Sequence, residues 1–137
     1  YDVKVGPKGE LVKFKARLVF VGAGQHPSSY EEVYANTVRY ASVRAIIACG
    51  AMWDDELFNI DIRGAYLYSD MDKELFMCEP PGHETLDEDG NTGNYVAKCL
   101  KALYGAKQSA KLWRTRLDKW LKAFGFHPAV HDECVYI

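Results

Sequence analysis

The sequence has no long hydrophobic run, only four cysteines and only four histidines. No apolar stretch approaches the roughly 20 residues that a membrane-spanning helix requires, and residues 1–4 do not begin a signal peptide with a charged start and an apolar middle. The cysteines are widely separated, form no C-x-x-C pair and have no histidine at zinc-ligand spacing. We therefore expect a soluble, intracellular protein without a membrane partner, whose thiols are reduced and packed.

The sequence also lacks internal repeats, heptads and low-complexity tracts. With 137 residues, of which 48% are hydrophobic, it is long enough for one globular core and short for two. We predict one domain over residues 13–137, preceded by an N-terminal lead-in at residues 1–12. The four histidines show no spacing typical of a metal site or a catalytic triad. His127 and His131 are an i, i+4 pair, but Pro128 makes a regular helix there improbable.

Charge is distributed unevenly along the chain, although the formal net charge is only −2. Residues 98–122 carry eight basic side chains and one acid, a net charge of +7, which would suit a surface that faces phosphate. Residues 54–89 carry twelve acids and two basic side chains, a net charge of −10. Such an acidic middle would repel nucleic acid unless most of it points elsewhere.

Hydrophobic periodicity and turn residues predict a mixture of strands and helices. Asn36 or Thr37 is expected to cap a first helix that ends near Trp53, and Ser109 a second helix that Gly125 ends. Residues 84–94, rich in acids, Gly and Asn, are expected to form a solvated connection. The predicted strands are residues 14–21, 57–62 (buried), 75–78, 95–100 and, as the start of a strand, 134–137.

The second predicted helix carries a stripe of large apolar side chains on one face. Its members are Trp113, Leu117, Trp120, Leu121 and Phe124. Such a stripe is more typical of packing in a core, although exposed aromatic rings can also stack on nucleic-acid bases.

One segment resembles a catalytic motif. Residues 61–67, Asp-Ile-Arg-Gly-Ala-Tyr-Leu, follow the apolar run 57–60 and resemble the first catalytic motif of a reverse transcriptase. Residues 68–82, and later residues 103–109 (Leu-Tyr-Gly-Ala-Lys-Gln-Ser) with Trp113, extend the likeness to the copia superfamily of LTR retrotransposons. The resemblance implies an α+β fold in which an antiparallel sheet packs on two or more helices, as the fingers and first part of the palm of a polymerase.

The resemblance assigns the metal ligands and a sugar gate. It implies that Asp61 is catalytic and that its carboxylate, with the backbone carbonyl of Ile62, binds Mg²⁺ or Mn²⁺ in a complete active site. Without the resemblance, a lone Asp after a strand is usually a turn or cap residue. Tyr66 lies where the family places an aromatic ring beneath the incoming sugar, to select deoxynucleotides, although an aromatic after a strand otherwise packs in a core.

The resemblance also implies contacts to nucleotide and template. Lys15 and Arg17 match a basic fingers strand, where the planar guanidinium of Arg17 is better suited to grip phosphate; on an ordinary strand they would form its solvated face. Ala106 and Ala110 stand where the family usually has Leu and Pro, and residues 34–38 do not match the family's usual motif at that place. The implied nucleotide-binding residues are Lys15, Arg17, Tyr66, Tyr104, Gly105 and Gln108, and the implied nucleic-acid-binding residues are Lys107, Lys111 and Arg114.

In the family a Tyr-x-Asp-Asp hairpin follows a segment like residues 132–136, and the sequence stops at Ile137 before such a motif. We therefore expect an RNA-directed DNA polymerase by ancestry, with an RNA/DNA primer–template and deoxynucleotides as partners, but an inactive chain when alone. The open sheet edge at residues 134–137 predicts a homo-oligomer. The family implies a cytoplasmic location, in a virus-like particle, or a nuclear one. The alternative is a truncated or domesticated retroelement protein that binds nucleic acid or protein without chemistry.

Overall fold

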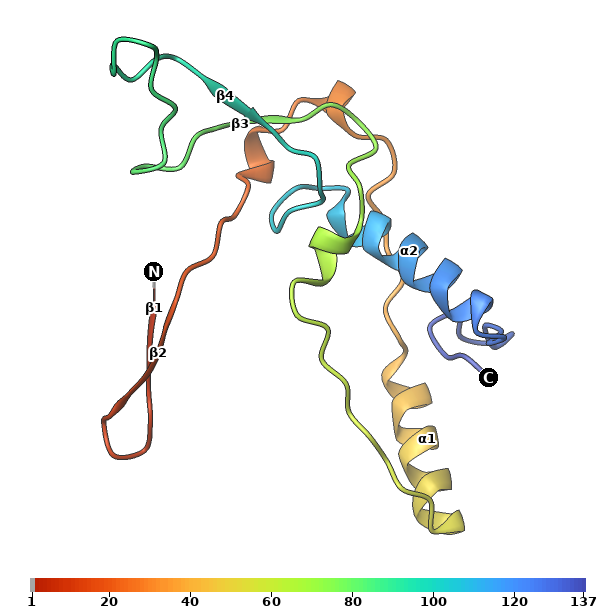
Figure 1. The fold of residues 1–137 in the computed structure, drawn as a ribbon. Helices are drawn as coiled ribbons and strands as arrows, with labels where there is room; N and C mark the ends of the chain where they lie inside the picture. Colours follow the sequence, from red (N-terminus) through yellow and green to blue (C-terminus); the bar gives the residue numbers. More distant parts are fainter. Residues whose placement is uncertain (1) are drawn as a thin grey trace.

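The computed structural model describes residues 2–137 and has a mixed α+β architecture (Figure 1). The described residues form two helices and two separate two-stranded antiparallel sheets, which confirms the predicted fold class. No helix within them is long and apolar enough to cross a bilayer. In chain order the elements are β1 (Asp2–Val5), β2 (Leu11–Lys15), η1 (Gly22–Gly24), η2 (Pro27–Ser29), α1 (Tyr40–Trp53), η3 (Ala65–Tyr68), β3 (Phe76–Cys78), β4 (Val96–Lys98) and α2 (Ser109–Ala123).

The first sheet is a hairpin that projects away from the helices (Figure 1). Its register pairs Asp2 with Lys15, and Gly9 adopts φ +78 in the connecting turn, a conformation that suits glycine. The predicted strand at residues 14–21 is therefore largely wrong, because regular pairing ends at Lys15. Residues 16–21 are apolar apart from Arg17, but no described strand runs beside them, and an apolar segment without a partner strand does not make a sheet. The hairpin spans the predicted boundary between lead-in and domain, which stays a prediction.

Helix α1 begins at Tyr40, later than predicted, and its first turn is capped from far away in the sequence. Neither Asn36 nor Thr37 caps it, and the N-cap residue Arg39 contributes no side-chain cap. Instead the Asp132 carboxylate accepts hydrogen bonds from the Arg39 backbone N–H (2.8 Å) and the Ser42 hydroxyl (2.6 Å). This carboxylate satisfies a backbone donor that the start of a helix leaves free. The predicted end at Trp53 is confirmed.

Acidification is expected to loosen the first turn of α1. Hydrogen bonds from the Ser42 hydroxyl, then from the Arg39 and Cys134 backbone N–H groups, hold the pKa of Asp132 below its usual value of 3.8. A lowered folded-state pKa stabilises the fold above the unfolded value, and that stabilisation is lost as the pH falls through the folded value. We expect the protection factor of the Arg39 amide hydrogen to fall between about pH 5 and pH 2.

The matched variants are Asp132→Asn and Asp89→Asn, the second in the exposed 84–94 connection. Asp132→Asn should lower Arg39 protection already at about pH 5 and remove most of its pH dependence. Asp89→Asn should behave like the unsubstituted chain. Equal protection in the unsubstituted chain and in Asp132→Asn at every pH would contradict the capping role.

The well-buried core is small and lies beside the β3–β4 sheet. Leu75, Cys99 and Ala106 form it, and the partly buried side chains packed against it are Phe20, Met71, Met77 and Leu103. The exposed surface of the chain is 11124 Å², against about 7,200 Å² for a compact monomer of this length. Much apolar surface therefore remains uncovered.

The predicted buried strand at residues 57–62 is wrong for the chain as it stands. These residues have no regular secondary structure, and Ile60 is 85% exposed. A strand that is apolar on both faces needs hydrogen-bonded neighbours and a packed layer. No described strand pairs with residues 57–62.

The β3–β4 sheet confirms the strand predicted at residues 75–78 apart from its first residue, and of the strand predicted at 95–100 it confirms residues 96–98, with Phe76 opposite Lys98. The connection at residues 84–94 is almost wholly exposed, as predicted. Local sequence signals decide both features, because short apolar segments flank a run of turn formers.

Helix α2 confirms the second predicted helix with a shift at its start. Ser109 is its first helical residue rather than its cap, and the Ser109 hydroxyl donates to the Leu103 carbonyl (2.6 Å). Gly125 ends the helix as predicted, with φ +92. Its N–H donates to the Lys122 carbonyl (3.0 Å) and the Phe126 N–H to the Leu121 carbonyl (3.1 Å), which is a Schellman ending.

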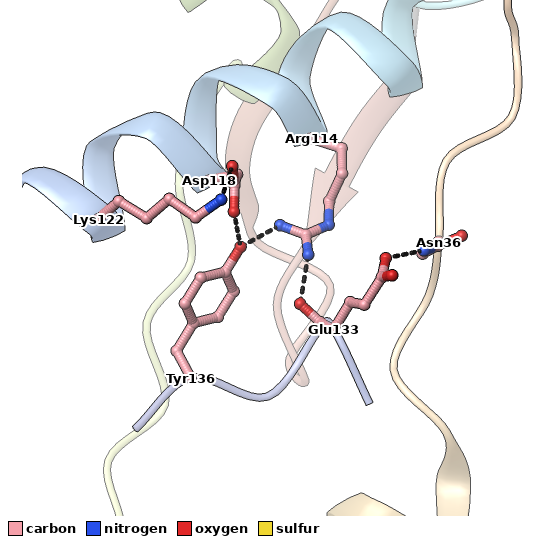
Figure 2. A network of polar contacts seen from close by, with 6 residues as sticks. All are labelled: Asn36, Arg114, Asp118, Lys122, Glu133 and Tyr136. Atoms are coloured by element: carbon pink, nitrogen blue, oxygen red, sulfur yellow. Dashed lines mark hydrogen bonds and ion pairs between the residues drawn. The ribbon is translucent and has the colours of Figure 1, made fainter. Parts of the chain in front are cut away.

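The C-terminal segment folds back on itself and is tied to α2. His127 and Ile137 exchange two backbone hydrogen bonds of 2.9 Å, so the predicted strand at 134–137 is a short antiparallel bridge within the chain. Figure 2 shows the polar network that anchors it: the Tyr136 hydroxyl accepts from Arg114 (2.6 Å) and donates to Asp118 (2.7 Å). One edge of residues 135–137 thus has a partner, and the predicted homo-oligomer stays a prediction.

Candidate nucleotide site

The segment that carries Asp61 and Tyr66 turns sharply at Gly64. Gly64 adopts the left-handed conformation (φ +62) at the N-cap of η3, and its carbonyl accepts a hydrogen bond from the Leu67 N–H (2.9 Å). Left-handed backbone favours glycine, so the turn explains why this residue lies between the acid and the aromatic. The Asp61 side chain is exposed, and no partner for its carboxylate occurs among residues 2–137. Asp61 is therefore accessible to a ligand from solvent.

The structure brings together two predicted nucleotide-binding residues from separate motifs. The rings of Tyr66 and Tyr104 have centroids 4.6 Å apart and an interplanar angle of 57°, a tilted arrangement that aromatic pairs favour. Tyr66 is half-buried, and Tyr104 is 46% exposed. The pair thus presents aromatic surface to solvent and is not enclosed in the core.

The loop that carries Tyr104 crosses the backbone of residues 20–22 at very short range. The Phe20 N–H donates to the Tyr104 carbonyl (2.7 Å). A Cβ on Gly105 would lie 1.9 Å from the Phe20 carbonyl oxygen, and one on Gly22 would lie 2.0 Å from the Gly105 carbonyl oxygen. Gly105 therefore permits a close approach of its backbone to residues 20–22.

Gln108, predicted to contact nucleotide, is wholly buried at the far end of the same loop. Its side-chain amide donates to the Ser29 carbonyl (3.0 Å) and contacts the Met71 sulfur (3.2 Å), and its carbonyl accepts from the Gln25 amide (2.8 Å). Sequence reasoning did not single out Gln25. The available signal was weak: Gln25 and Gln108 are the only glutamines in the chain.

The predicted nucleic-acid-binding residues are engaged in contacts within the chain. The Lys107 ammonium donates to the Tyr30 hydroxyl (3.0 Å) and lies 4.5 Å from the centre of that ring. Lys111 pairs with Glu32 (2.9 Å), and Arg114 belongs to the Tyr136 network of Figure 2. Phosphate would therefore have to compete with, or displace, these partners.

Ion pairs also link the basic and acidic segments that the sequence separates. Lys98 pairs with Glu74 and Lys101 with Asp70. Each lysine, through a hydrogen bond and its charge, holds the pKa of its partner carboxyl below the usual range. Part of the +7 segment is thus neutralised by the −10 segment.

The remaining predicted phosphate ligands lie at the end of the N-terminal hairpin. Lys15 is the last residue of β2 and half-buried, whereas Arg17 follows the strand and is exposed. The hairpin projects away from η3 and α2 (Figure 1). The structure therefore does not gather Lys15 and Arg17 with the two tyrosines.

A pocket of about 370 Å³ adjoins Ile62 and the apolar stripe of α2. Three stripe residues, Trp113, Leu117 and Trp120, line it. Trp120 is nevertheless 57% exposed, and its ring packs edge-on against that of Phe124 with centroids 5.1 Å apart. Three of the five stripe residues are thus partly covered and two are exposed, so core packing and base stacking both remain interpretations. The lining residues are Ile62, Tyr68, Trp113, Arg116, Leu117 and Trp120.

The fit of a metal ion rests on Asp61 alone. Within residues 2–137 no three His, Cys, Asp or Glu side chains come together in a group that would hold a metal ion. Two metal ions in a polymerase site need several carboxylates. At Asp61 the described residues offer a single carboxylate and the neighbouring Ile62 carbonyl, which is an incomplete set of ligands for the metal ions.

A family model described as reverse transcriptase (RNA-dependent DNA polymerase) matches residues 1–137. The chain therefore belongs to the reverse transcriptase family, and its curated relatives support a fragment of a copia-type reverse transcriptase.

The relatives are much longer proteins. The chain is 32% identical over 93% of its length to the retrovirus-related Pol polyprotein from transposon TNT 1-94 of Nicotiana tabacum. It is 31% and 28% identical over its whole length to the corresponding polyproteins from transposons RE1 and RE2 of Arabidopsis thaliana. In each case it spans 9% of the relative. No solved structure matches the chain.

Proposed function

We propose that the chain supplies the fingers and the first part of the palm of a copia-type RNA-directed DNA polymerase. The observation that carries the proposal is the contact between Tyr66 and Tyr104, rings 4.6 Å apart from two separate family motifs. Tyr66 acts as the sugar gate that selects deoxynucleotides, and Tyr104 with Gly105 forms the neighbouring wall. Asp61, five residues before Tyr66 across the Gly64 turn, lies on the same segment as the gate.

Asp61 and the Ile62 carbonyl are the proposed first metal ligands. The reverse transcriptase family usually uses divalent metal ions, and Mg²⁺ or Mn²⁺ would position the attacking hydroxyl and brace the leaving pyrophosphate. Carboxylates beyond those described here must complete the site. The catalytic role of Asp61 therefore belongs to an assembled polymerase, and we expect the chain alone to be inactive.

Template and nucleotide phosphates are proposed to replace partners that the basic residues now have. Lys111 and Arg114 belong to α2, and Lys107 lies just before it. A surface ion pair such as Lys111–Glu32 contributes little stability, so phosphate can displace it. Lys15 and Arg17 would approach the triphosphate only if the hairpin swings toward the site. Gln108, being buried, acts through the loop that it holds.

Primer–template binding tests the proposal. We expect an RNA/DNA primer–template to bind with a slope of log K against log salt of about −0.7 to −0.9 for each phosphate contacted. Lys111→Gln should lower the steepness of that slope by about one contact. Lys8→Gln, which removes the same charge from the turn of the β1–β2 hairpin, is the control and should leave it unchanged. A fluorescence titration of the labelled duplex at several salt concentrations measures both, and binding without a salt slope would contradict the proposal.

A second candidate is a non-catalytic module that binds protein or nucleic acid, and the uncovered apolar surface favours it. Ile60 and the stripe residues Trp120 and Phe124 are exposed, and large exposed apolar patches mark interaction sites. Self-association would also cover this surface. An intracellular location, in the cytoplasm or the nucleus, is proposed for either function.

A further inference from the structure

We infer that the buried amide pair Gln25–Gln108 is a positioning joint that holds Tyr104 against Tyr66. The inference rests on the proposed function where it treats the two tyrosines as walls of a nucleotide pocket. The joint itself rests on contacts alone. Neither glutamine contacts the proposed nucleotide, and both act through the tyrosines.

The two glutamines form a directional chain of hydrogen bonds. The Lys107 backbone N–H donates to Gln25 Oε1 (3.0 Å), Gln25 Nε2 donates to Gln108 Oε1 (2.8 Å), and Gln108 Nε2 donates to the Ser29 carbonyl (3.0 Å). Gln25 is 5% exposed and Gln108 fully buried. A buried amide that loses a partner leaves a donor or acceptor without compensation from water, so each glutamine fixes the orientation of the other.

The hydrogen-bonded glutamines hold the Tyr104 loop on one side, and the close backbone crossing with residues 20–22 holds it on the other. The Tyr104 carbonyl accepts a hydrogen bond from the Phe20 N–H (2.7 Å). Three residues later, the Lys107 N–H donates to the Gln25 side chain. The glycines at the crossing leave no room for a side chain. The loop is therefore held at both ends of a short span, and the Tyr104 ring has little freedom to leave its place.

The same joint reaches the segment that carries Tyr66. Gln108 Nε2 lies 3.2 Å from the Met71 sulfur. Residues 69–71 are in turn fixed to the start of the Tyr104 loop, because the Ala102 N–H donates to the Ser69 carbonyl (2.9 Å) and the Met71 N–H to the Leu100 carbonyl (3.1 Å). Three segments therefore meet at Gln108, and two of them carry the tyrosines.

A purely structural amide pair would lower stability without changing how the rings lie in molecules that remain folded. A positioning joint changes the ring contact itself. Photo-oxidation with a ruthenium trisbipyridyl complex and persulfate couples adjacent tyrosines, and mass spectrometry assigns and quantifies the Tyr66–Tyr104 dityrosine. This yield reports ring proximity directly and does not depend on catalysis or on nucleotide.

Gln25→Met keeps the length of the side chain and removes both its donor and its acceptor. We expect it to reduce the Tyr66–Tyr104 yield by about fivefold or more, as the loss of a buried hydrogen bond would. Gln25→Glu keeps the acceptor for the Lys107 N–H and removes the amide that donates to Gln108 and, at 3.5 Å, to the Ser29 carbonyl, so it should also reduce the yield. If Gln25→Met does not fold, Gln25→Glu replaces it in the cross-linking test. Gly125→Ala, at the far end of α2, lowers stability away from the joint and should leave the yield unchanged.

Nucleotide binding separates the joint from the proposed function. We expect Gln25→Met to raise the dissociation constant of a deoxynucleoside triphosphate, measured calorimetrically with Mg²⁺, in step with the loss of cross-link. If the unsubstituted chain binds no nucleotide while the cross-link still falls in the variants, the joint stands and the nucleotide pocket does not. If folded Gln25→Met and Gln25→Glu both give the unsubstituted yield, the joint is overturned, whatever nucleotide binds.

Discussion

Replacing Gly105 by alanine is expected to destabilise the chain by about 3 kcal/mol or more, because two penalties add at this position. Its φ of +90 is unfavourable for a residue with a Cβ. The new Cβ would also lie 1.9 Å from the Phe20 carbonyl oxygen, which belongs to backbone and cannot move aside as a side chain can. The backbone of residue 105 must move away from Phe20, and the hydrogen bond between the Phe20 N–H and the Tyr104 carbonyl must break. Urea unfolding, together with exchange of the Phe20 amide hydrogen, measures the effect.

Gly125→Ala is the matched control for this prediction. Gly125 has nearly the same φ, +92, but a Cβ there would meet nothing within 4 Å. It should therefore cost only the backbone term, about 1–2 kcal/mol, and leave Phe20 exchange unaltered. Equal destabilisation by both substitutions would show that the close crossing contributes nothing.

Replacing Asp61 by asparagine is expected to lower Mg²⁺-dependent primer extension by about 100-fold or more, because a neutral amide replaces a charged metal ligand. The chain alone is expected to be inactive, so the assay supplies in trans a copia-type palm segment that carries the Tyr-x-Asp-Asp hairpin. Affinity for the primer–template and its salt slope should not change, because Asp61 is not a phosphate ligand. Extension of a labelled primer and a parallel binding titration measure the two quantities.

Asp55→Asn is the control, since it removes the same charge from an exposed acid of the same acidic segment. It should leave extension unchanged. Undiminished extension by Asp61→Asn would remove Asp61 from the proposed mechanism. If the complemented, unsubstituted chain binds primer–template but never extends it, the non-catalytic binding module becomes the better account.

Local signals located several elements correctly. Gly125 ended α2 because a left-handed residue is needed there, and the acidic, glycine-rich residues 84–94 formed an exposed connection. Short apolar runs predicted β3 and β4, because the residues that favour a strand and the turn beside it lie within a few positions of one another. The start of α1 was misplaced because its capping carboxylate, Asp132, lies more than 90 residues away.

The contacts among the candidate site residues could not be predicted from the sequence, and their roles remain predictions. Tyr66 and Tyr104 were both expected near nucleotide, and the structure adds that their rings touch. Gln108 was expected to face nucleotide and is buried, while its partner Gln25 went unnoticed. A side chain's partner across the fold cannot be deduced from spacing, because spacing describes only neighbours along one helix or strand.

The sequence by itself determined the family, the α+β class and the positions of the glycines at Gly64, Gly105 and Gly125, since these depend on residue identity and local backbone preference. Only the tertiary structure decided which charges neutralise one another and which amides are buried. It also decided that residues 57–62 remain without a partner strand. Burial and pairing are properties of segments distant in sequence that meet in space, and a strand becomes buried only when another segment supplies hydrogen bonds and covers its faces.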